Sequence, residues 1–220
     1  MNESEFRRRL ADANDKYDIS RLMSEVLDDA AFDPDIPDAD MKNVPSMVGR
    51  IIDSGLFDIN FHDESDALGY DFPVSPLRYL KNETAVEAAK IIFARCGLPC
   101  AEWEKPGTES PPGKLFMDDL LDNICVDDEI SLSVTRVYLL AASYYEGDSY
   151  IRFSENVGRE VFDYDSTDVV PVPFGTGRSL TKEVLRNIDR IDFTIEPIGV
   201  MRKKIHIFEK NTKIKIAEFI

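Results

Sequence analysis

Cysteine and histidine are scarce in this chain, which limits the chemistry that it can support. Its 220 residues include three cysteines, and its two histidines, His62 and His206, lie in different halves of the sequence. Three cysteines are too few for a disulfide framework. A zinc site normally needs four ligands in close-set pairs, and this spacing does not offer them. We therefore expect neither a metal nor a cofactor.

Long apolar runs are also missing. The longest, such as VYLLAA, are far shorter than the roughly 20 residues that cross a bilayer as a helix. The opening residues, MNESEFRRRLADANDK, contain no apolar signal core. Hydrophobic residues still make up 43% of the chain, which is enough for a core. We expect a cytoplasmic protein that does not contact a membrane.

Positive charge is scarce in the first two thirds of the chain. Overall, 26 Lys and Arg face 42 Asp and Glu, a net charge of −16. Residues 1–148 hold 14 of the bases and 31 of the acids, a net −17, whereas residues 149–220 hold 12 and 11, a net +1. A field of one sign speeds association with an oppositely charged partner, although acidic surfaces also simply keep proteins dispersed. Direct binding of nucleic-acid phosphates by residues 1–148 is disfavoured.

The hydrophobic pattern changes at the same place as the charge. Before residue 148, apolar residues recur at three- and four-residue spacings, which predicts helices over residues 5–15, 18–30, 44–55, 82–97, 113–124 and 131–145. After residue 148, short alternating segments predict strands near residues 150–154, 160–164, 169–174, 192–197, 204–209 and 213–219. A hairpin turn at Asn211 and Thr212 and one helix from about Ser179 to Ile188 complete this half. We predict an α+β protein with a helical domain, 1–148, and a small strand-rich domain, 149–220.

The middle of the helical half resembles an ankyrin repeat. The segment SPLR, residues 75–78, stands where that family has Thr-Pro-Leu-His, at the turn that begins the inner helix. The segment VEAAKIIFARCG stands where the family has its outer helix, which closes on a left-handed glycine, here Gly97. GLFDIN, residues 55–60, is similar to the family's finger entry, and Gly69 stands at the fingertip.

This resemblance covers roughly residues 19–148 and includes clear departures. Arg78 replaces the family's histidine, Leu80 replaces its alanine, and the first and third units lack the Thr-Pro-Leu signature. Inserted fingers also stretch the repeat period. The resemblance implies stacked helix pairs with long inserted fingers, and a protein-binding function carried by the fingers and inner helices.

Two of the implied fingers combine acidic and aromatic residues. The first spans residues 60–72, and the second, residues 100–113, contains the only tryptophan. Aromatic residues among acids suit a hot spot for a basic partner. The candidate partner-binding residues are Asp63, Glu64, Asp66, Tyr70, Asp71, Glu102, Trp103 and Glu104. We hypothesise an acidic inhibitor or immunity-type protein that masks a basic toxin or nuclease, with a scaffold or assembly component as an alternative.

One segment leaves an enzymatic alternative open. FDYDST, residues 162–167, matches the Asp-x-Asp-x-Thr nucleophile motif of haloacid-dehalogenase-type phosphatases. In that motif Asp163 would attack phosphorus and Asp165 would act as acid and base. Only 53 residues follow Thr167, too few for that fold. The alternative is therefore a hydrolase-like site in the C-terminal domain, with Arg178 and Lys182 as further candidates.

Overall fold

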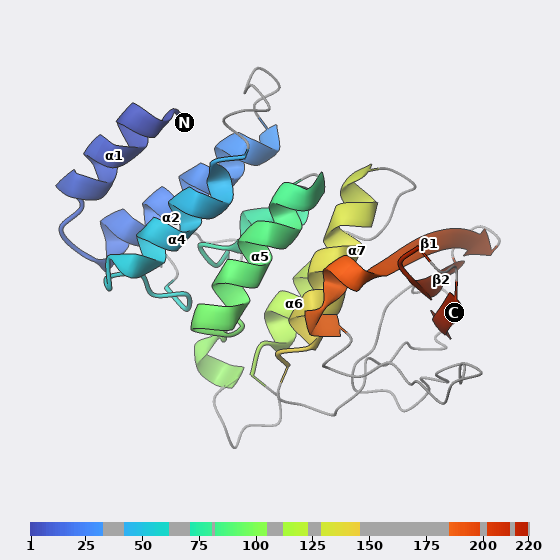
Figure 1. Cartoon of the computed structure of the whole chain (residues 1–220). Helices are drawn as coiled ribbons and strands as arrows, with labels where there is room; N and C mark the ends of the chain where they lie inside the picture. The colour runs from blue at the N-terminus through green and yellow to red at the C-terminus, as the bar shows by residue number, and fades with distance from the viewer. Residues whose placement is uncertain are drawn as a thin grey trace.

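The chain folds as a series of helices followed by a small antiparallel sheet (Figure 1). This computed structural model describes residues 1–32, 42–61, 71–80, 82–104, 112–122, 129–145, 185–198, 202–211 and 214–219. Within these residues the layout is helix-rich, and the α+β class predicted from the sequence is confirmed. The predicted domain boundary at residue 148 and the predicted strands before residue 185 lie outside the described residues.

All six helical segments predicted from the apolar spacing are helices. They are α1 (Glu3–Asp12), α2 (Lys16–Phe32), α4 (Val44–Asp53), α5 (Asn82–Cys96), α6 (Lys114–Asp122) and α7 (Glu129–Ala142). Side chains cap the first two, because Asn2 accepts a hydrogen bond from the Glu5 N–H and Asp15 accepts one from the Asp18 N–H, each at 2.9 Å. Pro45 lies in the first turn of α4, where its missing N–H costs nothing.

Glycines end two of these helices as the sequence predicts. Gly55 and Gly97 follow α4 and α5 with positive φ angles of 73° and 75°. The Gly97 N–H donates to the Phe93 carbonyl at 3.1 Å, which satisfies one of the last carbonyls of α5. Residues with a Cβ rarely adopt this conformation.

The SPLRY segment forms the 3-10 helix η1 (Ser75–Tyr79), which is shorter than the inner helix that the ankyrin resemblance implies. Little room exists for a longer helix, because Leu80 is already extended and α5 begins at Asn82. Two further 3-10 turns are η2 (Glu102–Glu104) and η3 (Ile188–Arg190). Residues 185 and 186, at the end of the helix predicted to close near Ile188, are helical.

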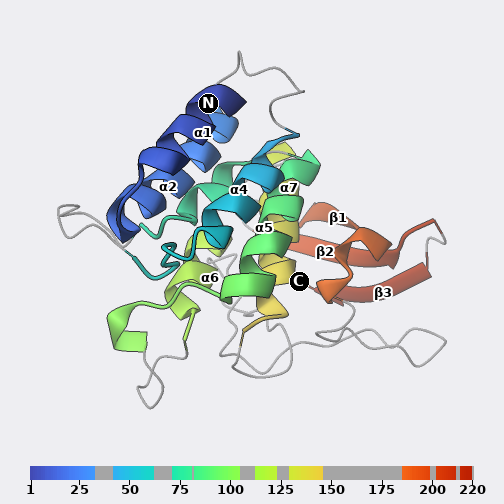
Figure 2. The ribbon, with the colours of Figure 1, turned by 60° about the vertical axis from the view of Figure 1, so that its left-hand side comes forward.

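The helices follow one another across the molecule from α1 to α7, with the sheet beyond α7 (Figures 1 and 2). Helix α4 packs on α5, and α5 packs on α7. On their other side, α2 contacts η1, and η1 contacts α6. The buried apolar residues between these elements form one continuous cluster, whose largest members include Phe6, Met23, Phe93, Phe116 and Tyr138.

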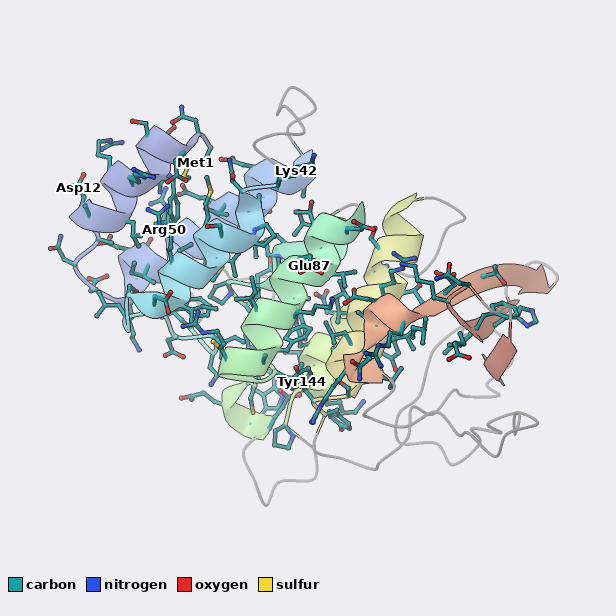
Figure 3. The ribbon with its side chains drawn as sticks, in the orientation of Figure 1. Met1, Asp12, Lys42, Arg50, Glu87 and Tyr144 are labelled. Carbon is teal, nitrogen blue, oxygen red and sulfur yellow. The ribbon has the colours of Figure 1, made fainter. Side chains whose placement is uncertain are left out.

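A chain of aromatic rings crosses this core. Phe116 of α6 contacts Phe72 and Phe93 edge to face, with ring centroids 6.3 and 5.9 Å apart. Phe93 in turn contacts Tyr144, 6.0 Å away. Arg186 lies over the Tyr144 ring at 5.1 Å and donates to the Ser143 carbonyl, so the chain that leads to the sheet is held against the end of α7. Figure 3 labels Tyr144, which follows α7.

The sheet has three antiparallel strands in the order β1 (Ile191–Ile198), β2 (Arg202–Glu209) and β3 (Ile214–Phe219). These are the last three strands predicted from the alternating pattern, and they are confirmed. Ile191 pairs with Glu209 across β1 and β2, and Ile205 pairs with Phe219 across β2 and β3. Asn211 lies in the turn between β2 and β3 with φ 68°, as the predicted hairpin requires; Thr212 lies outside the described residues.

Candidate binding groove

Part of the site predicted from the sequence lies outside the described residues. This applies to four finger residues, Asp63, Glu64, Asp66 and Tyr70. It applies equally to the candidates for hydrolase chemistry, Asp163, Asp165, Arg178 and Lys182. The structure places the other four predicted partner-binding residues, which are Asp71, Glu102, Trp103 and Glu104.

The two predicted fingers begin next to each other. Asn60, at the start of the first, accepts a hydrogen bond through Oδ1 from the Cys100 N–H at the start of the second, at 2.7 Å. Glu102 and Trp103 are exposed in η2, and 43% of the Trp103 surface remains accessible. Trp103 is therefore not buried under the second finger.

Glu104 is a correction to the predicted site. Its surface is only 1% exposed, and its carboxylate points inward. Oε2 accepts from the Ala101 N–H at 2.9 Å, and Oε1 accepts from the Leu115 N–H at 2.5 Å. Leu115 is in the first turn of α6, where backbone N–H groups have no partner within the helix. Glu104 thus connects η2 to α6 and is not available to a partner.

A groove of about 510 Å³ opens between α2, η1 and the two ends of the first finger. Helix α2 contributes Tyr17, Ser20, Arg21, Ser24 and Asp28. The opposite wall is formed by Phe61 and residues 71–73 together with η1, which contributes Ser75, Pro76, Arg78 and Tyr79. Of the four predicted partner-binding residues that the structure describes, only Asp71 lines the groove.

The spacing of residues along α2 explains how this helix contributes both to the core and to a polar wall of the groove. Tyr17, Arg21, Ser24 and Asp28 recur at three- and four-residue intervals and share one face. The apolar residues of α2, among them Ile19, Leu22 and Met23, are buried in the core. Ser24 Oγ donates to the Pro73 carbonyl at 3.3 Å and so ties this wall to the opposite one.

The turn before η1 is held by a reciprocal pair of hydrogen bonds. The Phe72 N–H donates to Ser75 Oγ at 3.0 Å, and the Ser75 N–H donates to the Phe72 carbonyl at 2.9 Å. Both residues are buried. The Ser75 hydroxyl therefore fixes the turn at the start of SPLR.

Arg78 anchors η1 to its neighbours. Its Nη1 donates to both carboxylate oxygens of Asp119 in α6, at 2.7 and 2.6 Å, and Nη2 donates to Asp71 at 3.3 Å. The guanidinium also lies over the Tyr79 ring at 4.7 Å. Burial alone would lower the pKa of Arg78, but the hydrogen bond and charge of Asp119 raise it overall, so the side chain stays charged.

Asp28 has the opposite electrostatic environment. Its side chain is half-buried, and no described residue donates a hydrogen bond to it. Burial, followed by the charges of Asp29 and Asp71, raises the pKa of Asp28, and the nearby Arg78 only partly offsets this. The groove therefore contains a carboxylate whose charge the fold does not balance.

The floor of the groove also contains a polar atom without a partner. Ser20 is 1% exposed, and its Oγ makes no hydrogen bond with any described residue. The Nε atom of Arg78 is likewise buried and unpaired. Buried polar groups are normally hydrogen-bonded, so two unpaired atoms at one groove call for an explanation.

Sequence reasoning missed Asp28, Ser20 and the groove itself. A usable pattern was present, since the polar stripe on α2 repeats at helical spacing in DISRLMSEVLDD. The opposite wall of the groove, on η1 more than 40 residues away, could not be predicted from that stripe.

Metal and cysteine chemistry find little support in the part of the chain that is described. Those residues contain no group of three His, Cys, Asp or Glu that could hold a metal ion. Cys96 is half-buried, and burial raises the pKa of its thiol. Within the same residues, none of the helices combines the length and the apolar character needed to cross a bilayer.

Comparison with protein-family models, with curated proteins and with solved structures finds no match for this chain.

Proposed function

We propose that this chain is a binding protein whose acidic, ankyrin-like helical half masks a basic protein partner, in the manner of an inhibitor or immunity-type protein. The observation that carries the proposal is the concentration of negative charge, −17 in residues 1–148 against +1 in residues 149–220. A concentrated field of one sign favours rapid and selective association with an oppositely charged surface.

The order of helix contacts supports the ankyrin-like part of the proposal. Helix α2 packs on α4, η1 on α5, and α6 on α7, so the elements pair in chain order. One member of each pair also contacts its counterpart in the next, α4 with α5 and α5 with α7. The other members of the pairs also contact one another, α2 with η1 and η1 with α6. Stacked repeats are built from pairs that contact only their neighbours in this way.

The ion pairs within the chain explain why the field around these helices is negative. Among the twelve Lys and Arg described within residues 1–145, at least ten pair with an Asp or Glu of the chain itself. These ten are Arg7, Arg8, Arg9, Lys16, Arg21, Arg50, Arg78, Lys90, Arg95 and Lys114. Acidic residues of the same chain thus neutralise most of the positive charge, and the surplus carboxylates determine the sign of the field around these helices.

The proposal is tested by capture and then by titration. The tagged full chain is used to capture proteins from a lysate of its source at low and high salt, and captured proteins are identified by mass spectrometry. The proposal predicts a basic protein that binds at low salt and is weakened by high salt. The purified protein is then titrated by calorimetry, and loss of its own activity on binding would distinguish an inhibitor from a scaffold.

A matched pair of variants locates the contact. The finger variant replaces Asp63, Glu64, Asp66 and Trp103 by alanine, and the control replaces three exposed carboxylates elsewhere, Asp12, Asp53 and Glu87. Both variants lose three negative charges. Affinity should fall far more in the finger variant, because hot spots carry most of the binding energy. Equal losses would mean that charge acts only at long range, and no loss in either would refute the proposed partner surface.

A further inference from the structure

The charges that line the groove balance everywhere except at Asp28. Arg21 donates to Glu25 in the next turn of α2 at 2.9 Å. Arg78 is held by Asp119 and Asp71. Asp28 has no such base, and it lies close enough to Asp71 for the two carboxylates to repel. A cation placed between them would relieve that repulsion.

The far end of the groove is aromatic. Tyr17 and Phe61 meet edge to face with ring centroids 5.8 Å apart, and 41% of Tyr17 remains exposed. Lys16 Nζ already lies 5.6 Å from the centre of the Phe61 ring, so one side of this aromatic pair is occupied. The accessible side of Tyr17 offers an apolar surface for a second ring or an aliphatic chain.

The length of the groove excludes a single side chain as its occupant. Tyr17 and Asp28 are eleven residues apart on one face of α2, which corresponds to about 16 Å at 1.5 Å per residue. An extended peptide rises about 3.3 Å per residue, so about five residues cover the same distance. The unpaired hydroxyl of Ser20 lies on the floor between the two ends.

We propose that this groove binds an extended segment of the partner, about five residues long, with a basic side chain between Asp28 and Asp71 and an aromatic or aliphatic side chain against Tyr17. This inference rests on the proposed function and names the part of the partner that is recognised. Ser20 supports this occupant, since a peptide carbonyl or N–H in the groove supplies the hydrogen-bond partner that its hydroxyl lacks among the described residues. Main-chain contacts then give affinity, and the two end pockets give specificity.

The direct test uses short peptides and the full chain. The probes are acetylated and amidated Arg-Gly-Ser-Gly-Tyr and its reverse, Tyr-Gly-Ser-Gly-Arg, titrated against the isotope-labelled protein and followed by its amide NMR shifts. One direction is expected to bind saturably and to shift the amides of Tyr17 and Asp28. Replacing arginine by citrulline, which keeps the shape but removes the charge, is expected to weaken binding about tenfold.

Two variants with the same chemical change make the test specific. Asp28→Asn should weaken the arginine peptide about tenfold and leave the citrulline peptide unchanged. Asp53→Asn removes a charge from an exposed residue of α4 that pairs with Arg95 and does not line the groove, and it should change neither affinity. Thermal unfolding of Asp28→Asn verifies that it is folded, since no basic residue loses its partner in this variant.

Several results would overturn the groove inference. They are equal binding of the arginine and citrulline peptides, an unchanged affinity in Asp28→Asn, or no saturable binding by either peptide up to its solubility limit. The proposed function fails separately. If a basic partner is captured in a salt-dependent way but Asp28→Asn binds it normally, the protein masks its partner through another surface. If the peptides bind as expected but no basic protein is captured, the groove is real and the masking function is wrong.

Discussion

Glu104 is the residue whose role can be tested most sharply, because its sequence context predicts a partner contact and its structure gives it an internal one. Its carboxylate accepts from the Ala101 and Leu115 N–H groups and is 1% exposed. Hydrogen bonds to a charged group contribute about 1.5–3 kcal/mol each. Glu104→Ala leaves both N–H groups without their acceptor, so we expect a loss of about 3–5 kcal/mol in the free energy of unfolding. Glu104→Gln keeps one acceptor oxygen and should lose about half as much.

The assay uses the position of the only tryptophan. Trp103 directly precedes Glu104, so its fluorescence reports on η2, while far-UV circular dichroism reports on all the helices. In the wild type the two urea transitions should coincide. In Glu104→Ala the fluorescence transition should move to lower urea than the circular dichroism transition, because η2 loses its anchor to α6 before the remaining helices unfold.

Glu102→Gln provides the control, since Glu102 is the exposed glutamate of the same turn. Surface substitutions of this kind usually change stability by less than about 0.5 kcal/mol. A structural role for Glu104 is refuted if Glu104→Ala and Glu102→Gln have the same unfolding free energy. It is equally refuted if Glu104→Ala retains wild-type stability but loses a partner, because Glu104 would then be a contact residue.

Three further predictions concern the groove wall, a helix end and pH. Arg78→Met should cost about 2–4 kcal/mol in urea unfolding because it removes the ion pair between Arg78 and Asp119, and adding Asp119→Leu should recover most of the loss. An additive double variant would argue against this pair. Gly97→Ala should cost about 1–2 kcal/mol because φ is 75°, and Gly97→Asn should cost less; equal stability of all three would show that this conformation is not required. Asp28→Asn should raise the melting temperature at pH 7, because the raised pKa of Asp28 means that its negative charge destabilises the folded state above the ordinary pKa of 3.8. The gain in melting temperature should vanish as the pH falls below 3.8, and a gain that persists in acid would contradict this origin.

The helices and final strands could be predicted because their causes are local. In α2, for example, Ile19, Leu22, Met23 and Val26 repeat at the spacing that places them on one buried face. The ends of α4 and α5 were equally predictable, since glycine is the residue that most readily adopts positive φ. No distant part of the chain is needed for either inference.

The site could be predicted only in part because its causes are distant. Glu102 and Glu104 flank Trp103 and look equivalent in sequence, yet Glu104 turns inward because it meets the Leu115 N–H eleven residues later. Asp28 shares the acidic character of many neighbours, and only burial by residues on η1 and the finger ends separates it from them. Composition predicted the sign of the surface charge but could not show which carboxylates make hydrogen bonds within the fold.

Arg78 fixes η1 to a distant part of the chain. The ankyrin resemblance places a histidine here, where it would make a local hydrogen bond within the turn. The turn in this chain is a 3-10 helix of five residues, of which Ser75, Pro76 and Leu77 are buried. The longer arginine reaches Asp119 on α6, 41 residues away, and fixes η1 from outside. Since the same guanidinium also holds Asp71, the side chain that stabilises the short helix also positions a carboxylate of the groove, so Arg78 links the stability of η1 to the shape of the groove.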